Sequence, residues 1–283
     1  MLKDKKIQNI LSKKERGEKI TMLTAYDYPL ASLIDQAGID IVLVGDSLAN
    51  VVLGLESTKE VGMNEMIHHA KAVCRAVKNA LVIGDMPFVA YHDHPQEAVR
   101  NAKRFIEEAG CGAVKLEWFD QCVETTQKII QSGIPVMGHI GLTPQTADQL
   151  GGLKVQGREV KSAKKLVEES IALQVAGCFA IVLECIPDKL AQLITKQLRI
   201  PTIGIGGGVH CDGQVLVTYD LLGLFDGYHP KFVKQYANLS SLISQAVLQY
   251  KKEVQSGQFP DEAHSFKISP EELDQLKKQL GIK

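Results

Sequence analysis

Short runs of apolar, often β-branched residues alternate with longer stretches of helical periodicity along most of the chain, and this rhythm restricts the fold more than any other feature. Strands are expected at Ile20–Ala25, Ile41–Val44, Leu81–Asp85, Ala113–Glu117, Pro135–His139, Phe179–Glu184 and Pro201–Gly206, with a weaker eighth between Val215 and Val233. Helical stretches lie between them, among them Pro95–Ala109, Cys122–Ser132, Val160–Ala176 and Pro187–Leu198. The pattern is typical of an α/β protein built from repeated strand–helix units.

Seven or eight such units suit a closed (β/α)8 barrel, which typically takes about 250 residues. The strands are almost continuously apolar, which indicates a sheet that is covered on both faces. An open, doubly wound sheet is the alternative, but no G-x-G-x-x-G turn follows the first strand, where a dinucleotide fold places its phosphate site. We therefore predict a (β/α)8 TIM barrel that forms a single domain over residues 1–283.

Both ends of the chain indicate helices outside the barrel. The first twenty residues are predicted to form an N-terminal helix before the first strand. Near the other end, Ser269 is a candidate N-cap, Pro270 occupies the first helical position, and Glu271 and Glu272 place acids in the first turn. A short C-terminal helix should therefore close the chain.

Composition and charge exclude several classes of partner and location. With 32 Lys and Arg against 33 Asp and Glu, the formal charge is −1, and the basic residues are scattered. This balance argues against nucleic acid or a membrane surface as a partner, because both require a basic face. The six cysteines form no C-x-x-C pair, and the N-terminal stretch lacks the apolar core of a signal peptide, so we expect free thiols and a cytoplasmic protein.

Polar residues stand where the predicted strands end. Since barrel enzymes build their sites at the C-terminal ends of the strands, these side chains should converge on one rim. They are Asp46, Ser47, Asp85, Lys115, Glu117, His139 and Glu184. Packed together, Asp46, Asp85 and Glu117 would repel one another unless a cation joined them, and all-oxygen ligation favours Mg²⁺ over zinc.

Each of these residues also has a structural interpretation without catalysis. Asp46 or Asp85 could be the N-cap of a following helix, and Lys115 could form a structural ion pair. His139 could be a core histidine that is hydrogen-bonded to a loop carbonyl. Glu184 is harder to explain in this way, because an acid after an apolar strand costs several kcal/mol to ionise without a partner, so its burial would indicate proton transfer.

At these same residues the sequence resembles the 3-methyl-2-oxobutanoate (ketopantoate) hydroxymethyltransferases over roughly residues 20–266. The most specific stretches are TAYDYPLA at 24–31, VGDSLANVVLG at 44–54, GHIGLTPQ at 138–145, GGLKVQGR at 151–158, LECIP at 183–187 and HSF at 264–266. One departure stands beside the site, where Trp118 and Phe119 follow Glu117 in place of the two glycines usual in the family.

The resemblance implies transfer of a hydroxymethyl group from the co-substrate 5,10-methylenetetrahydrofolate to the 2-oxoacid 3-methyl-2-oxobutanoate, giving 2-dehydropantoate for pantothenate and coenzyme A synthesis. It implies Mg²⁺-assisted enolisation with Glu184 as proton acceptor and His139 as a further catalytic residue. Asp46, Asp85 and Glu117 match the metal-site acids. Asp46, Ser47, Asp85 and Lys115 match the substrate-binding residues. The resemblance also implies a homo-oligomer, commonly a decamer.

Two other classes of protein fit the same features. The nearer is a metal-dependent barrel lyase or mutase of the isocitrate lyase and phosphoenolpyruvate mutase kind, although the Lys-Lys-Cys-Gly loop of the lyases is absent from the sequence. The farther is a binding protein that keeps the barrel but not the reaction. An assay for turnover with the folate co-substrate distinguishes the hydroxymethyltransferase, the lyase or mutase, and the binding protein.

Overall fold

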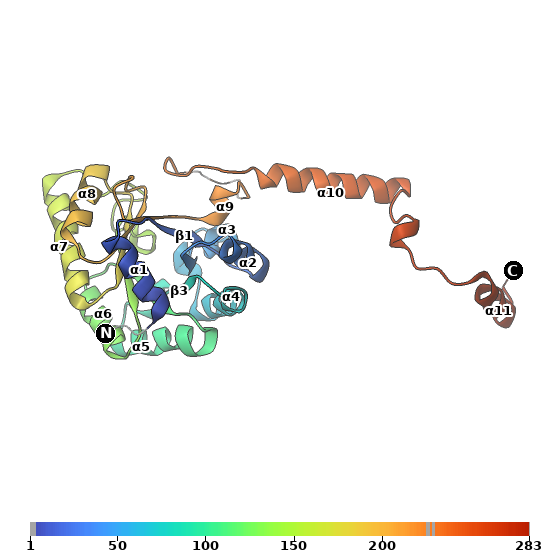
Figure 1. The fold of residues 1–283 in the computed structure, drawn as a ribbon, viewed down its shortest axis with the longest axis horizontal. Helices are drawn as coiled ribbons and strands as arrows, with labels where there is room; N and C mark the ends of the chain where they lie inside the picture. Colours follow the sequence, from blue (N-terminus) through green and yellow to red (C-terminus); the bar gives the residue numbers. More distant parts are fainter. Residues whose placement is uncertain (1–3, 225–226, 228–229, 283) are drawn as a thin grey trace. The chain divides into compact units, whose positions relative to one another are not determined.

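The computed structural model describes residues 4–224, 227 and 230–282. Eight parallel strands close into a barrel in the order β1 to β8, so the prediction of a (β/α)8 TIM barrel is confirmed (Figure 1). The strands are β1 (Ile20–Thr24), β2 (Ile41–Val44), β3 (Leu81–Asp85), β4 (Ala113–Glu117), β5 (Val136–Gly141), β6 (Ala180–Glu184), β7 (Thr202–Ile205) and β8 (Gly213–Leu216).

Helices and short turns connect these strands. The α-helices of this part are α1 (Lys5–Glu15), α2 (Tyr28–Gln36), α3 (Leu48–Val51), α4 (Met63–Ala76), α5 (Pro95–Arg104), α6 (Cys122–Gln131), α7 (Val160–Ala176), α8 (Asp188–Gln197) and α9 (Thr218–Leu221). Shorter helical turns are η1 (Thr58–Glu60), η2 (Phe88–Ala90), η3 (Phe105–Ala109) and η4 (Pro144–Thr146). The predicted helix Pro95–Ala109 therefore ends as an α-helix at Arg104 and continues as the π-turn η3.

Alternation along each strand divides the core into two layers. On β2, Ile41 and Leu43 point into the barrel, whereas Val42 and Val44 face the surrounding helices. This double burial explains the almost continuous apolar strands that the sequence displays. The N-terminal helix α1 was predicted, and its Ile7 and Ile10 belong to the interior layer.

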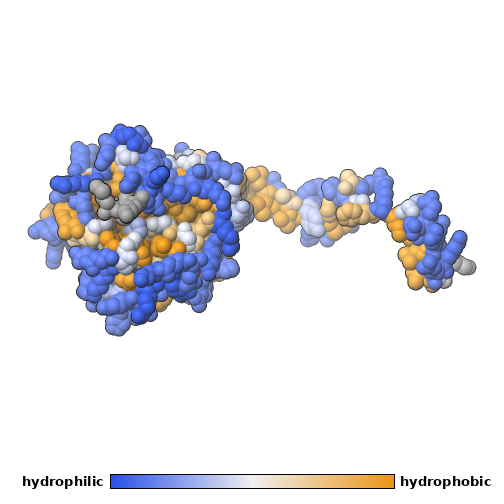
Figure 2. Space-filling view, turned by 60° about the horizontal axis from the view of Figure 1, so that its bottom comes forward, coloured by the Kyte–Doolittle hydropathy of each residue, from blue (hydrophilic) through white to orange (hydrophobic). Residues whose placement is uncertain are grey.

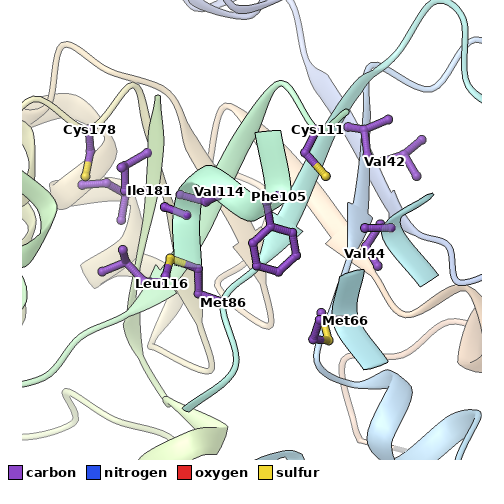
Figure 3. Packing of buried hydrophobic residues seen from close by; sticks show 14 of the residues in the cluster. Val42, Val44, Met66, Met86, Phe105, Cys111, Val114, Leu116, Cys178 and Ile181 are labelled. Carbon is purple, nitrogen blue, oxygen red and sulfur yellow. The ribbon is translucent and has the colours of Figure 1, made fainter. Parts of the chain in front are cut away.

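The outer layer includes a close contact between β3 and η3. Gly84 presents only a hydrogen to the ring of Phe105, and a Cβ atom at this position would lie 2.2 Å from the ring. Figure 3 shows Phe105 between Met86 and Val114 on one side and Val44 on the other. Glycine is therefore needed within β3 so that the π-turn η3 can pack on the barrel.

The eighth strand begins earlier than the sequence predicted. The expected range, Val215 to Val233, includes residues 225, 226, 228 and 229, which lie outside the described residues. The strand itself starts at Gly213, two residues before that range. A Cβ at Gly213 would lie 2.5 Å from the carbonyl oxygen of Ile20 on β1, so the close approach of the two strands selects a residue with low strand propensity.

The chain divides into two compact units, 1–235 and 236–283, and the barrel lies in the first. The second contains α10 (Leu239–Ser256), which the sequence analysis did not single out, the turn η5 (Glu262–His264) and α11 (Pro270–Leu280). The short C-terminal helix was predicted with its cap, and the backbone N–H of Glu272 donates to Ser269 Oγ at 3.2 Å. A single domain over 1–283 stays a prediction.

Two further expectations from the sequence concern thiols and membranes. All six cysteines are free, as predicted from their spacing. In the described ranges, no helix combines the length and the apolar character that a membrane crossing requires.

Candidate active site

Because side chains alternate in direction along a strand, the predicted residues point into the mouth of the barrel. On β4, Ala113 belongs to the interior layer, and Lys115 and Glu117 follow on the same face. The same relation places the last residue of β3, a residue of β5 and the last residue of β6 inward. Together with the loop after β2, these strands line one cavity of about 380 Å³ with Asp46, Ser47, Asp85, Lys115, Glu117, His139 and Glu184.

A buried ion pair occupies the β3–β4 side of this cavity, which is named here the barrel cavity. The strand register places Asp85 beside Lys115, and Lys115 Nζ lies 2.7 and 2.8 Å from the two carboxylate oxygens of Asp85. Burial raises the pKa of Asp85 above its usual range, although Lys115 acts in the opposite direction. Burial alone would lower the pKa of Lys115, but Asp85, Glu117 and Asp46 raise it, so the ammonium stays charged.

Gln145, in η4, connects the carboxylates of two strands. Its Nε2 donates to Asp46 Oδ2 at 2.8 Å and to the Met86 carbonyl at 3.1 Å, and its backbone N–H donates to Glu117 Oε2 at 3.0 Å. Its Oε1 accepts a hydrogen bond from the hydroxyl of Tyr91. Gln145 is fully buried, so these contacts fix the orientation of both acids within a buried network.

His139 lies between two carboxylates. Its Nδ1 is 3.4 Å from Glu117 Oε1 and its Nε2 is 3.3 Å from Glu184 Oε2, and neither contact has the alignment of a hydrogen bond. Burial and Lys115 lower the pKa of His139, but the two carboxylates outweigh them and raise it to about 9. The imidazole is therefore positively charged near neutral pH. Burial raises the pKa of Glu117, and His139 and Lys115 oppose that change.

Glu184 is less buried than the sequence analysis assumed. Its side chain is 15% exposed, compared with 2% for His139 and Glu117. It is the last residue of β6, where the interior layer opens into the barrel cavity. The carboxylate therefore combines a cationic partner, His139, with access for a small molecule.

The structural interpretations of the two aspartates are wrong. Helix α3 is capped at Ser47 and η2 at Pro87, so neither Asp46 nor Asp85 is an N-cap. His139 contacts two carboxylates instead of a loop carbonyl. Ser47 is half-buried, and its Oγ lies 2.8 Å from the hydroxyl of the buried Tyr26. The predicted residues therefore form one polar cluster whose members face a cavity.

Asp46 and Asp85 are the carboxylates best placed for a shared cation. The backbone N–H of Asp46 donates to Asp85 Oδ2 at 3.3 Å, so the loop after β2 lies directly against the end of β3. The oxygens of Glu117 instead contact the backbone N–H of Gln145 and the imidazole of His139. Across the ranges that the structure describes, no three His, Cys, Asp or Glu side chains form a ready metal site. Two carboxylates nevertheless fit Mg²⁺, which keeps several water or substrate oxygens among its ligands.

Two polar residues of the site were missed at the level of the sequence. Gln145 follows the fifth strand within the GHIGLTPQ stretch, and Tyr91 lies in the loop after β3. The hydroxyl of Tyr91 also accepts a hydrogen bond from the backbone N–H of Glu117 at 3.3 Å. The available signal for Gln145 was an uncharged amide next to a strand end, which is too common a pattern to indicate a site.

The solved structures that the chain resembles share its fold. A crystal structure of 2,3-dimethylmalate lyase, a member of the phosphoenolpyruvate mutase/isocitrate lyase superfamily, superposes with a TM-score of 0.59 at 15% sequence identity, covering 98% of this chain and 96% of that chain. At this identity, the similarity indicates a common barrel architecture.

The sequence comparisons are much closer. A model of the ketopantoate hydroxymethyltransferase family matches residues 4–262. The 3-methyl-2-oxobutanoate hydroxymethyltransferase of Syntrophomonas wolfei is 59% identical over 264 residues, which cover 93% of this chain and 96% of that protein. The enzyme of the same name from Carboxydothermus hydrogenoformans is 53% identical over 270 residues, covering 95% and 98%. The chain therefore belongs to the ketopantoate hydroxymethyltransferase family, a family of transferase enzymes.

Proposed function

We propose that the protein transfers a hydroxymethyl group from 5,10-methylenetetrahydrofolate to carbon three of 3-methyl-2-oxobutanoate and forms 2-dehydropantoate for pantothenate synthesis. The observation that carries this proposal is the barrel cavity, in which a buried cation and two acids face an accessible Glu184 that is paired with His139. An α-oxoacid needs a cationic region for its two oxygen groups and a base beside its acidic C–H.

Asp46 and Asp85 would hold a magnesium ion. The ion, when bound, acts as a Lewis acid that withdraws electrons from the oxoacid and makes its carbon-three hydrogen more acidic. Because the oxygens of Glu117 contact Gln145 and His139, whereas Asp46 and Asp85 contact each other, we assign Glu117 to a contact with the ion through water. Gln145 keeps Asp46 in place, since its Nε2 donates to Asp46 Oδ2.

Lys115 supplies permanent positive charge near the substrate. Its ammonium is fixed by Asp85, and it is buried at the base of the barrel cavity. This charge favours the anionic oxoacid and the negative charge that develops on it during enolisation. Ser47, which lines the same cavity, offers a hydroxyl to the substrate.

Glu184 accepts the proton from carbon three. The C–H bond breaks, and its electron pair then forms the new C–C bond to the one-carbon unit. The two carbon–nitrogen bonds that hold this unit to the folate break, so that tetrahydrofolate leaves with the proton from Glu184 and one proton from water. The hydroxide that remains of this water becomes the new hydroxyl group. His139, held by Glu117 on its other side, positions the carboxylate of Glu184 through the 3.3 Å contact. A positioned base of this kind typically contributes about 10²–10⁴-fold to the rate.

A turnover assay tests this function. Purified protein, 3-methyl-2-oxobutanoate, 5,10-methylenetetrahydrofolate and Mg²⁺ should yield 2-dehydropantoate and tetrahydrofolate in equal amounts, measured by mass spectrometry. If the protein forms no product with the folate co-substrate but cleaves a 2-oxoacid adduct, the lyase alternative is favoured. Absence of both reactions would favour a non-catalytic binding protein.

We also propose a homo-oligomer, specifically a decamer, in the cytoplasm. Helix α10 has no buried residue within its unit, and its exposed apolar side chains Ile243, Val247, Tyr250 and Val254 recur at the spacing of one helical face. Hydrophobic surface is visible in the space-filling view of the molecule (Figure 2). An isolated helix of this length is marginal in water, so a second copy of the chain is the natural partner of this face. Light scattering coupled to gel filtration measures the assembly. The balanced charge favours no nucleic-acid or membrane partner.

A further inference from the structure

A second cavity lies beside the barrel cavity and has no role in the chemistry described above. Its volume is about 530 Å³, and it is named here the α7 cavity. Its walls come from the loop after β4, the end of β5 with the loop that follows, and the first half of α7. This volume is typical of small-molecule sites.

The two cavities are separated by a single thickness of chain. Gly141 and Thr143 line the α7 cavity, whereas Leu142 and Pro144, the residues that follow each of them, line the barrel cavity. Two later neighbours in the sequence also line different cavities: Val155 lines the barrel cavity and Gln156 lines the α7 cavity. A ligand in the α7 cavity would therefore contact the same segment of chain that lines the barrel cavity.

One wall of the α7 cavity is aromatic. Trp118, Phe119 and His92 line it, and the rings of His92 and Phe119 lie 4.6 Å apart. The backbone N–H of Trp118 donates to the carbonyl of His139 at 2.9 Å, which attaches this wall to the active-site strand β5. Such a wall favours a flat heterocyclic ring over an aliphatic acid.

Helix α7 contributes a buried carboxylate to the lining of this cavity. Glu169, on α7, is 7% exposed, and its Oε1 lies 3.6 Å from Nζ of Lys165, a lysine whose side chain is 73% exposed. Burial raises the pKa of Glu169 to about 7. A carboxylate here repels anions such as the oxoacid and accepts hydrogen bonds from paired N–H donors.

We propose that the α7 cavity binds the pterin ring of the folate co-substrate, with Glu169 accepting hydrogen bonds from the ring N3–H and the adjacent 2-amino group while Trp118 and Phe119 contact the ring face. This assignment rests on the proposed function. A pterin presents two neighbouring N–H donors on one edge, which matches the two oxygens of a carboxylate. Lys165 at the rim then meets the negatively charged tail of the folate.

The test compares tetrahydrofolate binding to three full-length proteins: the wild type, Glu169→Gln and Glu168→Gln. Glu168 is the matched control, because it precedes Glu169 on α7, is 63% exposed and contacts Lys164 at 3.6 Å. Affinities are measured by calorimetry and by the fluorescence of Trp118, the only tryptophan in the sequence, corrected for absorbance of the ligand. Circular dichroism and oxoacid affinity show whether Glu169→Gln is folded.

Glu169→Gln should weaken tetrahydrofolate binding by roughly tenfold or more, because the amide offers a single acceptor and its NH₂ opposes the ring donors. Glu168→Gln should bind as the wild type does, and tetrahydrofolate should change the emission of Trp118. Equal affinities in Glu169→Gln and wild type would overturn the site, while product formation by the wild type would leave the proposed function intact. A wild type that neither binds tetrahydrofolate nor forms product would overturn both.

Discussion

Gln145 offers the sharpest test of how the acids of the site are held. Replacing it by methionine keeps the volume of the side chain but removes the bonds from Nε2 to Asp46 Oδ2 and to the Met86 carbonyl, and the acceptor of the Tyr91 hydroxyl. The backbone bond from residue 145 to Glu117 stays. The change therefore isolates the support of Asp46 from that of Glu117.

The magnitude follows from the contact that is lost. A hydrogen bond to a charged acceptor is worth about 1.5–3 kcal/mol. If the loss of this bond makes the positioning of Asp46 during ligand binding about 2 kcal/mol less favourable, Gln145→Met should raise the dissociation constant of 3-methyl-2-oxobutanoate roughly 30-fold at saturating Mg²⁺. The constant is measured by calorimetry without folate.

Gln127→Met is the control, since Gln127 is an exposed amide on α6 and lines neither the barrel cavity nor the α7 cavity. A dissociation constant for Gln145→Met within twofold of the wild-type value would refute the view that Gln145 organises the acids.

Three other perturbations address the metal, the ion pair and the scaffold. Chelation of Mg²⁺ should weaken oxoacid binding to the wild type, whereas Asp85→Ala should bind the oxoacid weakly with or without Mg²⁺; a metal-dependent affinity in the variant would contradict the role of Asp85. The same variant leaves Lys115 buried without its partner and should lose about 3–5 kcal/mol of unfolding free energy in urea, and unchanged stability would argue against a buried pair. Asp35 accepts hydrogen bonds from the backbone N–H groups of Lys78, Asn79 and Ala80, which outweigh its burial and lower its pKa. Its folded-state pKa is therefore below the unfolded value of about 3.9, so its contribution to stability is complete above about pH 4 and disappears as the pH falls through the folded value. Urea unfolding should find wild type more stable than Asp35→Asn at pH 7 and pH 5, with the difference shrinking near pH 3, and a constant difference would exclude this origin.

The sequence predicted the barrel because its continuous apolar strands, alternating with helices, result directly from the burial of both faces of the sheet. Residues such as Val42 and Leu43 are both apolar since one faces the helices and the other faces the interior. Strand ends were also predictable, because the interior face turns polar there, as at Lys115 and Glu117 on β4. Gly213 was not, because its place in β8 depends on the approach of Ile20 from another strand.

Parts of the site depended on contacts that no local pattern encodes. Gln145 reaches Asp46, which is 99 residues away in the sequence, and an amide has no signature that distinguishes this role. A structural ion pair of Lys115 was one of two interpretations left open, and only the strand register showed that Asp85 is the partner and that both residues face the barrel cavity. The exposure of Glu184 likewise depends on where β6 ends relative to its neighbours.

Proton exchange at carbon three of the oxoacid tests the central claim most directly. The wild type is incubated with 3-methyl-2-oxobutanoate and Mg²⁺ in deuterated water, with and without tetrahydrofolate, and loss of the carbon-three proton signal is followed by NMR. We predict Mg²⁺-dependent exchange in the wild type and a loss of at least about 10²-fold in Glu184→Gln, which should still bind the oxoacid. Exchange at the wild-type rate in Glu184→Gln would remove Glu184 from the role of base, and no exchange in the wild type under either condition would contradict the proposed enolisation.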